Sequence, residues 1–349
     1  MTYKIALYPG DGVGPEVVAE AKKILDRLPI QCEYAHFNWG TELYASTGRC
    51  APEDFLDRLM PFDAILLGAL GNAAKAPDHI AVDPLLTMRK SFDQYVNIRP
   101  AVLYEGVDCP LKNVRPFDID MVVIRENTEG EYTSLGGRHY PGTPNEAAIQ
   151  VNYFTRMGTE RIVRYAFETA RRRARKHVTS ITKSNALKYS MVFWDSVVAD
   201  VAKDYPDITY SPMLVDAAAM NFVRSPQMFD VVVASNLFGD ILTDIAAIIV
   251  GGMGFAGSAN INPSRKFPSM FEPVHGSAPD IAGRGKANPV AAILSAAMML
   301  EFLGEVECAE KVKLAVKAHL AEGSVKTPDR GGNSTTSQVG DDIASRLER

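Results

Sequence analysis

The sequence predicts an α/β protein, because short apolar runs of strand length alternate with longer stretches of helical periodicity. The runs VVI and VVVA are nearly continuous, which is typical of parallel strands that helices cover on both faces. Strands and helices that alternate in this way favour an α/β architecture. At roughly 100–200 residues per domain, the 349 residues are enough for two domains.

The expected elements follow one another along the chain as this pattern requires. Strands are expected at Ile5–Tyr8, Ala64–Leu67, Met121–Ile124, Val178–Ile181 and Val231–Ala234. Helices are expected at Glu16–Leu28, Thr159–Ala170 and Val290–Leu303. Tyr132–Gln150, rich in Gly, Pro, Thr and Tyr, is expected to form a loop or an extended arm, and Lys326–Thr336 a polar loop. No linker is evident, which indicates domains that the chain enters more than once.

Composition and charge exclude several classes of protein. The net charge is −5, whereas a dedicated nucleic-acid binder usually carries a basic excess. The basic cluster of residues 171–177 is best interpreted as a solvated helix end. The four cysteines are far apart and form no C-x-x-C pair, so neither a zinc site nor a redox motif is expected. The N-terminus lacks a long apolar region and Ile245–Gly257 is too short to span a bilayer, so a cytoplasmic protein without membrane contact is expected.

A glycine-rich loop follows the first expected strand, in the sequence GDGVGPE at residues 10–16. It is not a Rossmann dinucleotide fingerprint, because the third glycine should stand at position 15, which is Pro15. A tight turn with backbone N–H groups at a helix start remains. The loop is equally well interpreted as a plain strand–helix turn or as a ligand contact.

Two carboxylates, Asp240 and Asp244, follow the expected strand Val231–Ala234. Ligands of open α/β sheets bind beyond the carboxyl ends of the strands, and a helix places residues four apart on one face. Like charges at this spacing destabilise a helix unless a cation offsets them, and hard oxygen ligands favour Mg²⁺ or Mn²⁺. A solvated first helical turn explains the spacing equally well. A third acid, Asp216, interrupts an apolar stretch, where an acid is usually paired or functional.

Several basic residues and one tyrosine stand beside expected strands or in unusual contexts. A guanidinium binds a carboxylate through two parallel hydrogen bonds, so Arg89, Arg99 and Arg125 together suit a substrate with two carboxylates. Lys183 follows the strand Val178–Ile181 and is a candidate base, and Tyr132 is a candidate acid. Taken singly, each of these residues is more often structural.

These residues lie in runs that together resemble the β-decarboxylating dehydrogenases, the family of isopropylmalate, isocitrate and tartrate/D-malate dehydrogenases. The runs are GDGVGPE, FDQYVNIRP, RENTEGEY, TKSNAL, VDAAAM, NLFGDILTD, FPSMFEPVHGSAPDIAGRGKANP and TPDRGGNSTTSQVGD. The resemblance extends from end to end, and three of the runs, at residues 92–100, 125–132 and 267–289, look most like the tartrate/D-malate branch. It implies an isopropylmalate-dehydrogenase-like fold of two interwoven α/β domains, with residues 1–98 and 251–349 binding the cofactor and residues 99–250 binding substrate and metal and forming a dimer.

The resemblance also implies roles for the matching residues. Arg89, Arg99 and Arg125 would hold the substrate carboxylates, and Asp216, Asp240 and Asp244 a divalent metal. Lys183 would act as the base and Tyr132 as the acid. Lys183 and Asp216 would come from the partner subunit of a homodimer with shared active sites, and the Tyr132–Gln150 arm would form part of that contact.

For the cofactor, the resemblance implies a site that is not a Rossmann fingerprint. The cofactor residues would be His275, Gly276, Ser277, Ala278, Asp280 and Asn288. An acidic Asp280 would accept hydrogen bonds from ribose hydroxyls and repel a 2′-phosphate, which favours NAD over NADP. The expected cofactors are thus NAD, Mg²⁺ or Mn²⁺, and a monovalent cation.

The implied reaction is oxidation of a malate-type 2-hydroxy diacid, with hydride transfer to NAD and loss of the 3-carboxylate as CO₂. Tartrate and D-malate are the expected substrates, with a 3-alkylmalate such as 3-isopropylmalate as the alternative. The segment before Arg89 would face the substrate's C3 substituent. Tartrate and D-malate enzymes usually carry a tryptophan near Val82, whereas this chain has Val82, Asp83, Leu85 and Leu86. Asp83 would oppose an extra carboxylate, which disfavours isocitrate.

Two functions of other classes are disfavoured by the sequence. A non-catalytic paralogue of the same fold would have lost some of the arginines, the lysine, the tyrosine or the aspartates, and all are present. A Mg²⁺-dependent hydrolase or phosphoryl-transfer enzyme would need a P-loop, and no G-x-x-x-x-G-K-[ST] sequence occurs.

Overall fold

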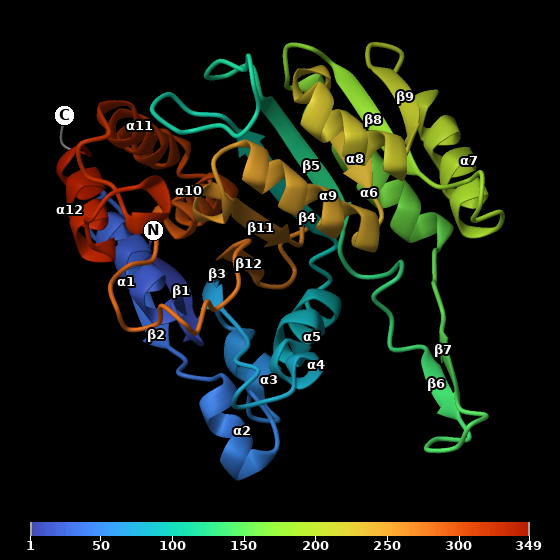
Figure 1. Cartoon of the computed structure of the whole chain (residues 1–349), viewed down its shortest axis with the longest axis horizontal. Coiled ribbons are helices and arrows are strands. Elements are labelled where there is room, and N and C mark those ends of the chain that lie inside the picture. The colour runs from blue at the N-terminus through green and yellow to red at the C-terminus, as the bar shows by residue number, and fades with distance from the viewer. Residues whose placement is uncertain (1, 348–349) are drawn as a thin grey trace. The chain divides into compact units, whose positions relative to one another are not determined.

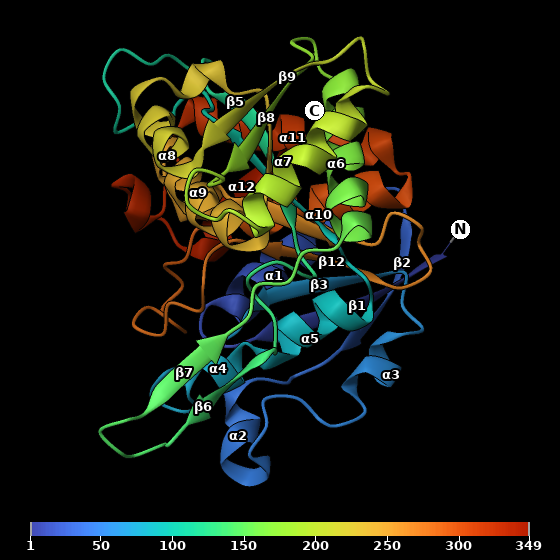
Figure 2. The same cartoon turned by 90° about the vertical axis from the view of Figure 1, so that its right-hand side faces the viewer.

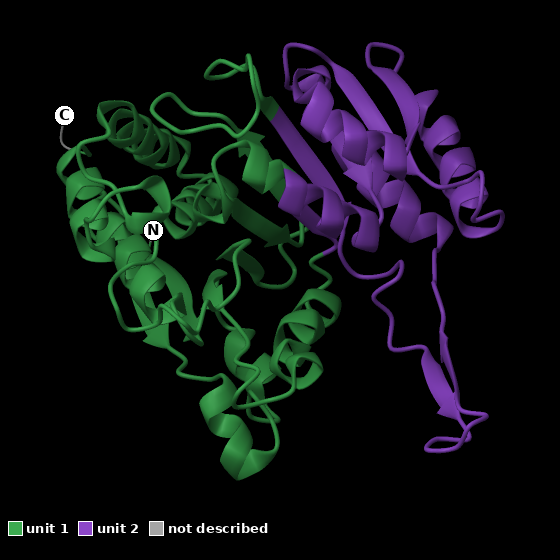
Figure 3. Cartoon of the chain, viewed as in Figure 1, with its two compact units in different colours: residues 1–94, 98–120, 246–349 green, residues 95–97, 121–245 purple. Residues whose placement is uncertain are grey.

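The structure, a computed structural model, describes residues 2–347. It divides into two compact units (Figure 3): unit 1 contains residues 1–94, 98–120 and 246–349, and unit 2 contains residues 95–97 and 121–245. The chain therefore enters each unit more than once. Residues 99–120 and 246–250 group with unit 1, whereas the expected boundaries placed them in the second domain. The functions assigned to the two domains stay predictions.

Unit 1 is built on a mixed sheet (Figure 1). Its strands lie in the order β2 (Gln31–His36), β1 (Thr2–Gly10), β3 (Ala64–Ala69), β12 (Ser269–Pro273) and β11 (Gly257–Ile261), and β4 (Val96–Val102) pairs next to β11. The pairs β1–β2, β1–β3 and β3–β12 are parallel, and β11–β12 is antiparallel. Every residue of β3 is buried, as its continuous apolar run predicts.

Helices pack on this sheet. The chain passes from β1 into α1 (Gly14–Leu25), which packs against β1, β3, α10 (Val290–Leu303) and α12 (Thr336–Ser345), and α11 (Val306–Glu322) packs against α10. Short helices α2 (Thr41–Thr47), α3 (Phe55–Leu59), α4 (Asp78–Ala81) and α5 (Asp83–Ser91) lie between β2 and β4 in the chain. Tyr8 of β1 packs into a core with Phe55 of α3 and Met88 of α5, so α3 and α5 bury their apolar faces against the sheet.

Unit 2 is built on four parallel strands in the order β5 (Asp120–Glu126), β10 (Val231–Ala234), β8 (His177–Thr182) and β9 (Thr209–Leu214). Helices α6 (Arg156–Arg171) and α7 (Ser190–Ala202) pack together and against β8, and α8 (Val215–Arg224) packs against β8 and β9. Helix α9 (Asn236–Ile249) starts two residues after β10 ends. The carboxyl ends of β5 and β10 are neighbours in this sheet, which brings the residues that follow them together.

An extended arm leaves unit 2 (Figure 2). It is the antiparallel hairpin of β6 (Gly136–His139) and β7 (Ala147–Gln150), in which every residue is exposed. The expectation of an extended arm in Tyr132–Gln150 is therefore confirmed. Its apolar side chains Leu135, Tyr140 and Ile149 are 50–69% exposed.

The expected strands and helices are all present, with ends that shift by a few residues. Strands β11 and β12 were missed, because GSANI and SMFEP contain Gly, Ser and Pro and show no regular alternation. Their full burial comes from their neighbours β3 and α10, which sequence patterning does not reveal.

Candidate active site

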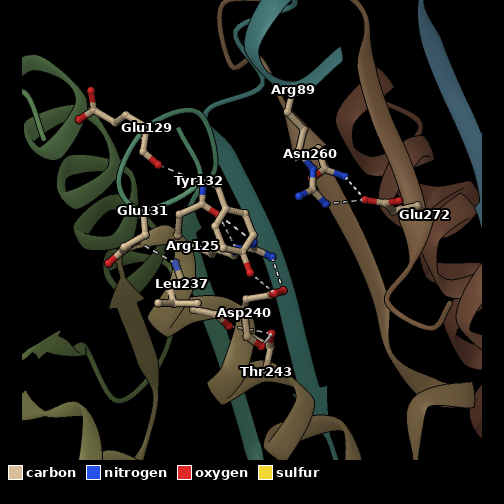
Figure 4. A network of polar contacts seen from close by, with 12 residues as sticks. Arg89, Arg125, Glu129, Glu131, Tyr132, Leu237, Asp240, Thr243, Asn260 and Glu272 are labelled. Carbon is tan, nitrogen blue, oxygen red and sulfur yellow. Dashed lines mark hydrogen bonds and ion pairs between the residues drawn. The ribbon is translucent and has the colours of Figure 1, made fainter. Parts of the chain in front are cut away.

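Arg125, the next-to-last residue of strand β5, organises the first cluster of predicted residues, which lies in unit 2 (Figure 4). Its Nε and Nη2 donate hydrogen bonds of 3.1 and 2.7 Å to Oδ1 of Asn236, the first residue of α9. Its Nη1 donates to Oδ1 of Asp240 at 2.6 Å. Arg125 is 1% exposed, so this cation is fully desolvated and depends on these partners. Asn236 opens the run NLFGDILTD, but no role was predicted for it.

A glycine makes room for this arginine. A Cβ added to Gly239 of α9 would lie 2.6 Å from Cγ of Arg125. Glycine is unfavourable inside a helix, so its presence here has a packing reason. Gly239 lets the aliphatic part of Arg125 lie directly against the backbone of α9.

Tyr132 joins the same carboxylate from its other side (Figure 4). Its hydroxyl donates to Oδ2 of Asp240 at 2.7 Å, and the Arg125 guanidinium lies 5.4 Å from the centre of the tyrosine ring. The Asp240 side chain is 35% exposed, so the carboxylate is reachable from solvent although both oxygens are bonded. Asp244, one helical turn further along α9, is exposed. The structure thus brings Arg125, Tyr132 and Asp240 together.

A buried acid, Glu126, ends β5 directly after Arg125 and holds the turn that follows the strand. Glu126 accepts hydrogen bonds from the backbone N–H groups of Thr128 and Glu129 and from the Thr128 hydroxyl. Burial nevertheless raises the pKa of Glu126 to about 7, against the effect of these hydrogen bonds. Sequence analysis missed Glu126, which adjoins Arg125 inside the run RENTEGEY.

Lys183 and Asp216 form a separate pair in unit 2. The Lys183 ammonium lies 2.8 Å from Oδ1 of Asp216, and the two side chains are 29% and 58% exposed. The hydrogen bond from Lys183 lowers the pKa of the Asp216 carboxyl. The predicted base and the predicted third metal ligand are therefore neighbours within one chain.

The predicted metal ligands have suitable chemistry, since three carboxylates are the hard oxygen donors that Mg²⁺ and Mn²⁺ prefer. Within the described part of one chain, no three His, Cys, Asp or Glu side chains gather in a way that could hold a metal ion. Asp240 contacts Arg125 and Tyr132, whereas Asp216 contacts Lys183.

Arg89 and Arg99, the other two predicted arginines, lie in unit 1 and are 5% and 7% exposed. Arg89 on α5 donates from Nη2 to Oε1 of Glu272 at 2.9 Å, and the same oxygen accepts from Nδ2 of Asn260 at 2.8 Å (Figure 4). Nε of Arg89 is buried and has no hydrogen-bond partner among the described residues. The ion pair holds the Arg89 guanidinium in place through Nη2. Its Nε–H group remains as a hydrogen-bond donor for a ligand. Glu272 and Asn260 were missed, since they belong to the unpredicted strands β12 and β11.

The predicted cofactor loop, residues 275–280, lies against the glycine-rich loop of unit 1. The backbone N–H of Val13 donates to the carbonyl of Ser277 at 2.8 Å, and the Ser277 hydroxyl donates to the carbonyl of Gly71. A Cβ on Gly12, whose φ is +59°, would overlap that Ser277 carbonyl. Gly12 therefore allows the glycine-rich loop and the predicted cofactor loop to lie in close contact.

Polar groups in this loop are compatible with a bound cofactor. Burial lowers the pKa of His275, and its Nε2 is buried with no hydrogen-bond partner within residues 2–347. Asn288 donates to Asp329 at 3.0 Å and accepts from the backbone N–H of Val290 at 3.1 Å. Gly276 and Asp280 are exposed, and Ala278 has a φ of +39°. A buried imidazole nitrogen without a partner among the described residues suits a ligand rich in hydroxyl and amide groups.

In residues 2–347, no helix is both long enough and apolar enough to cross a lipid bilayer. The four cysteines, Cys32, Cys50, Cys109 and Cys308, are free thiols.

Comparison with known proteins extends the sequence resemblance. The chain is 48% identical over 359 residues to the D-malate dehydrogenase [decarboxylating] of Escherichia coli, covering 100% of this chain and 99% of the relative. It is 47% identical over 360 residues to the tartrate dehydrogenase/decarboxylase of Pseudomonas putida, covering 100% and 98%. A solved structure, the isocitrate dehydrogenase of Methylococcus capsulatus, superposes with a TM-score of 0.90 at 38% identity and covers 99% of this chain and 100% of that one.

These relatives confirm the expected fold and the resemblance to the tartrate/D-malate branch, and they identify an oxidoreductase. The profile described as isocitrate/isopropylmalate dehydrogenase matches residues 4–343. The match spans both compact units and every predicted site residue. The chain belongs to the isocitrate/isopropylmalate dehydrogenase family.

Proposed function

We propose that the protein oxidises and decarboxylates a malate-type 2-hydroxy diacid, D-malate or tartrate, with NAD and a divalent metal. The observation that carries the proposal is the Arg125–Asp240–Tyr132 cluster, in which a fixed cation, a carboxylate and a phenol lie within hydrogen-bond distance. Such a cluster suits a reaction that needs an anchored carboxylate and a proton donor. The names of the relatives, D-malate and tartrate dehydrogenases, favour these substrates.

Each residue takes one role in this proposal. Arg89, Arg99 and Arg125 bind the substrate carboxylates, and their desolvation strengthens each such contact. Lys183 accepts the hydroxyl proton, and Tyr132 returns a proton to the carbon that loses CO₂.

Asp240, Asp244 and Asp216 would hold Mg²⁺ or Mn²⁺. His275–Asp280 and Asn288 would hold NAD. The bound groups would supply a hydride acceptor and a Lewis acid that polarises the 2-oxo group. Asp280, exposed and anionic, supports NAD rather than NADP. We propose that the enzyme also uses a monovalent cation.

The proposal includes a homodimer in which Lys183 and Asp216 serve the partner's site. It is supported by the exposed apolar side chains of the arm and by those of two helices, Met220 and Val223 on α8 and Ile241 on α9. These side chains are 51–64% exposed, and a partner subunit would bury them. The four free thiols are compatible with the reducing cytoplasm, where we place the enzyme.

A 3-alkylmalate is the second candidate substrate. Val82 and Leu86 are spaced four apart and lie on the side of α5 that carries Arg89, so they are placed to contact a C3 substituent. Both are small or flexible enough to admit an alkyl group. Leu85 packs into the aromatic core of unit 1, which leaves Val82 and Leu86 as the residues that set the size of this substituent.

The test is NADH formation by purified protein with Mn²⁺, across D-malate, L-tartrate, meso-tartrate, 3-isopropylmalate and isocitrate. D-malate or a tartrate should give the largest kcat/KM, and NADP should be a poor substitute. No NADH from any of the five acids would refute the proposed function.

A companion variant tests the metal. Asp244→Asn should raise the Mn²⁺ concentration that gives half-maximal rate by about tenfold or more. An unchanged Mn²⁺ dependence would remove Asp244 from the ligand set.

A further inference from the structure

Glu131, the residue before Tyr132, faces the first turn of α9 (Figure 4). Its Oε1 accepts a hydrogen bond from the hydroxyl of Ser235 at 2.8 Å, and its Oε2 accepts from the backbone N–H of Leu237 at 3.0 Å. Both oxygens are therefore used, and both partners belong to the start of the helix that carries Asp240. Glu131 has no role in the proposed mechanism.

The physical basis of this contact is the unsatisfied end of the helix. The first N–H groups of a helix have no partner inside it, and its N-terminus carries a partial positive charge. A carboxylate is the strongest acceptor that such a site can receive from a side chain. Glu131 fills this place from a different segment, about one hundred residues earlier in the chain.

The residues before Glu131 reinforce the attachment. The carbonyl of Glu129 accepts from Nδ2 of Asn236 at 3.0 Å. Gly130 has a φ of +86°, and a Cβ on it would lie 3.3 Å from that of Asn236. Its N–H and carbonyl also pair with those of Tyr153. Glu129 and Glu131 are thus bonded to the start of α9, and Gly130 between them is held by Tyr153.

Tyr132 continues directly from this attached segment. Its hydroxyl reaches Asp240, which lies one helical turn beyond Asn236 and so on the same face of α9. A rigid bond between Glu131 and the helix start fixes the Tyr132 backbone relative to the Asp240 side chain. We propose that Glu131 is a positioning residue that holds the Tyr132 hydroxyl on Asp240, an inference that rests on the proposed role of Tyr132 as the acid.

A simple helix cap would act differently. It would stabilise α9 and therefore affect Asp240 and the Arg125 contacts as well as Tyr132. A positioning residue acts through Tyr132. Replacing Glu131 should therefore leave kcat almost unchanged in a protein that already lacks the Tyr132 hydroxyl. A double-mutant cycle measures this difference.

The first experiment compares Glu131→Ala in the wild-type and Tyr132→Phe backgrounds, using the full-length protein with NAD, Mn²⁺ and its best diacid. In the wild-type background kcat should fall by about tenfold or more with KM changed by less than about threefold. In the Tyr132→Phe background the same substitution should change kcat by less than about twofold. Equal falls in the two backgrounds, or no fall in either, would overturn the proposal.

Conservative variants keep the test informative if Glu131→Ala folds poorly. Glu131→Gln retains an acceptor for the Leu237 N–H and an amide that Ser235 can accept from, so it should recover most of the lost kcat. Ser235→Ala should lower kcat less than Glu131→Ala does, since one of the two bonds remains. A larger loss in Glu131→Gln than in Glu131→Ala would contradict the role. Glu168→Gln, an exposed carboxylate on α6 paired with Arg171, is the control for loss of charge.

The second experiment needs no substrate. In protein labelled with carbon-13 at tyrosine Cζ, the Tyr132 resonance is identified by its loss in Tyr132→Phe. Glu131→Ala should move this resonance, because the bond to Asp240 is released, and Glu168→Gln should leave it in place. If the resonance stays unchanged in Glu131→Ala, the positioning role is wrong. If the protein oxidises none of the diacids but the resonance moves, the proposed function fails while the contact itself stands.

Discussion

Tyr132 and Asp240 are joined by a 2.7 Å hydrogen bond, although 108 residues separate them in the chain. The same carboxylate binds Arg125 through its other oxygen at 2.6 Å. A single acid thus connects the proposed proton donor with a proposed substrate-binding cation, and each of the three side chains limits where the other two can lie.

Tyr132→Phe removes the proton donor and keeps the ring. We expect kcat to fall by about 100-fold or more, in the range of a lost general acid, while KM for the diacid changes by only a few-fold. Steady-state kinetics with NAD and Mn²⁺ measures both values. A kcat within about threefold of wild type would exclude Tyr132 as the acid.

Gly239→Ala tests the close approach of Arg125 to α9. Alanine would favour the helix by about 0.5–1 kcal/mol, but its Cβ would lie 2.6 Å from Cγ of the buried Arg125, and overpacking typically costs about 1–3 kcal/mol. The arginine should therefore shift, and KM for the diacid should rise by about tenfold. KM for NAD is the internal control and should not change. A stabilised protein with normal KM would show that the arginine tolerates the methyl group.

Glu272→Gln tests the buried ion pair of unit 1. Removing one charge of a buried pair leaves Arg89 without its counterion, so the free energy of unfolding should fall by about 3 kcal/mol. Urea unfolding at neutral pH measures the change. Asp54→Asn, which breaks the exposed pair with Arg58, should cost less than about 1 kcal/mol. Similar losses in the two variants would show that burial adds nothing to the Arg89–Glu272 pair.

The raised pKa of Glu126 predicts that the free energy of unfolding depends on pH. Its pKa in the folded protein is about 7, above the ordinary 4.5, so the folded state binds the proton more tightly than the unfolded state does. The contribution of Glu126 to stability is therefore present at low pH and is lost as pH rises from about 4.5 to about 7, by about 3 kcal/mol in total.

The measurement is urea unfolding across this pH range for the wild type and Glu126→Gln. The histidines with lowered pKa act in the opposite direction, so the difference between the two proteins is the relevant quantity. The wild type should lose stability relative to the variant as pH rises. A constant difference would mean that Glu126 titrates near its ordinary value.

Asp280→Lys tests the choice of dinucleotide. An exposed lysine in place of the acid should attract a 2′-phosphate, so kcat/KM should fall for NAD and rise for NADP, each by about tenfold. Asp280→Asn is the matched control: it should weaken NAD and improve NADP less than Asp280→Lys does, since it removes the repulsion but supplies no cation. Unchanged selectivity in Asp280→Lys would place the adenosine ribose elsewhere.

Much of the fold follows from local pattern. The runs that became β3, β5 and β10 are continuously apolar, and burial on both faces demands that pattern. Arg125 lies at the carboxyl end of β5, and the α9 acids Asp240 and Asp244 come after β10. This position near the carboxyl ends of strands identified them as candidates.

The sequence by itself thus determined the α/β class, the helix spacing of Asp240 and Asp244, the failure of the first glycine loop as a Rossmann fingerprint, and the family. The tertiary structure alone decided which partners these residues have. Glu272 pairs with Arg89 across 183 positions, and Glu131 reaches the start of α9 across more than a hundred. The physical reason is that hydrogen bonds and ion pairs depend on distances of a few ångströms in space, which only the packing of strands and helices sets, whereas periodicity and spacing record the local geometry of the chain.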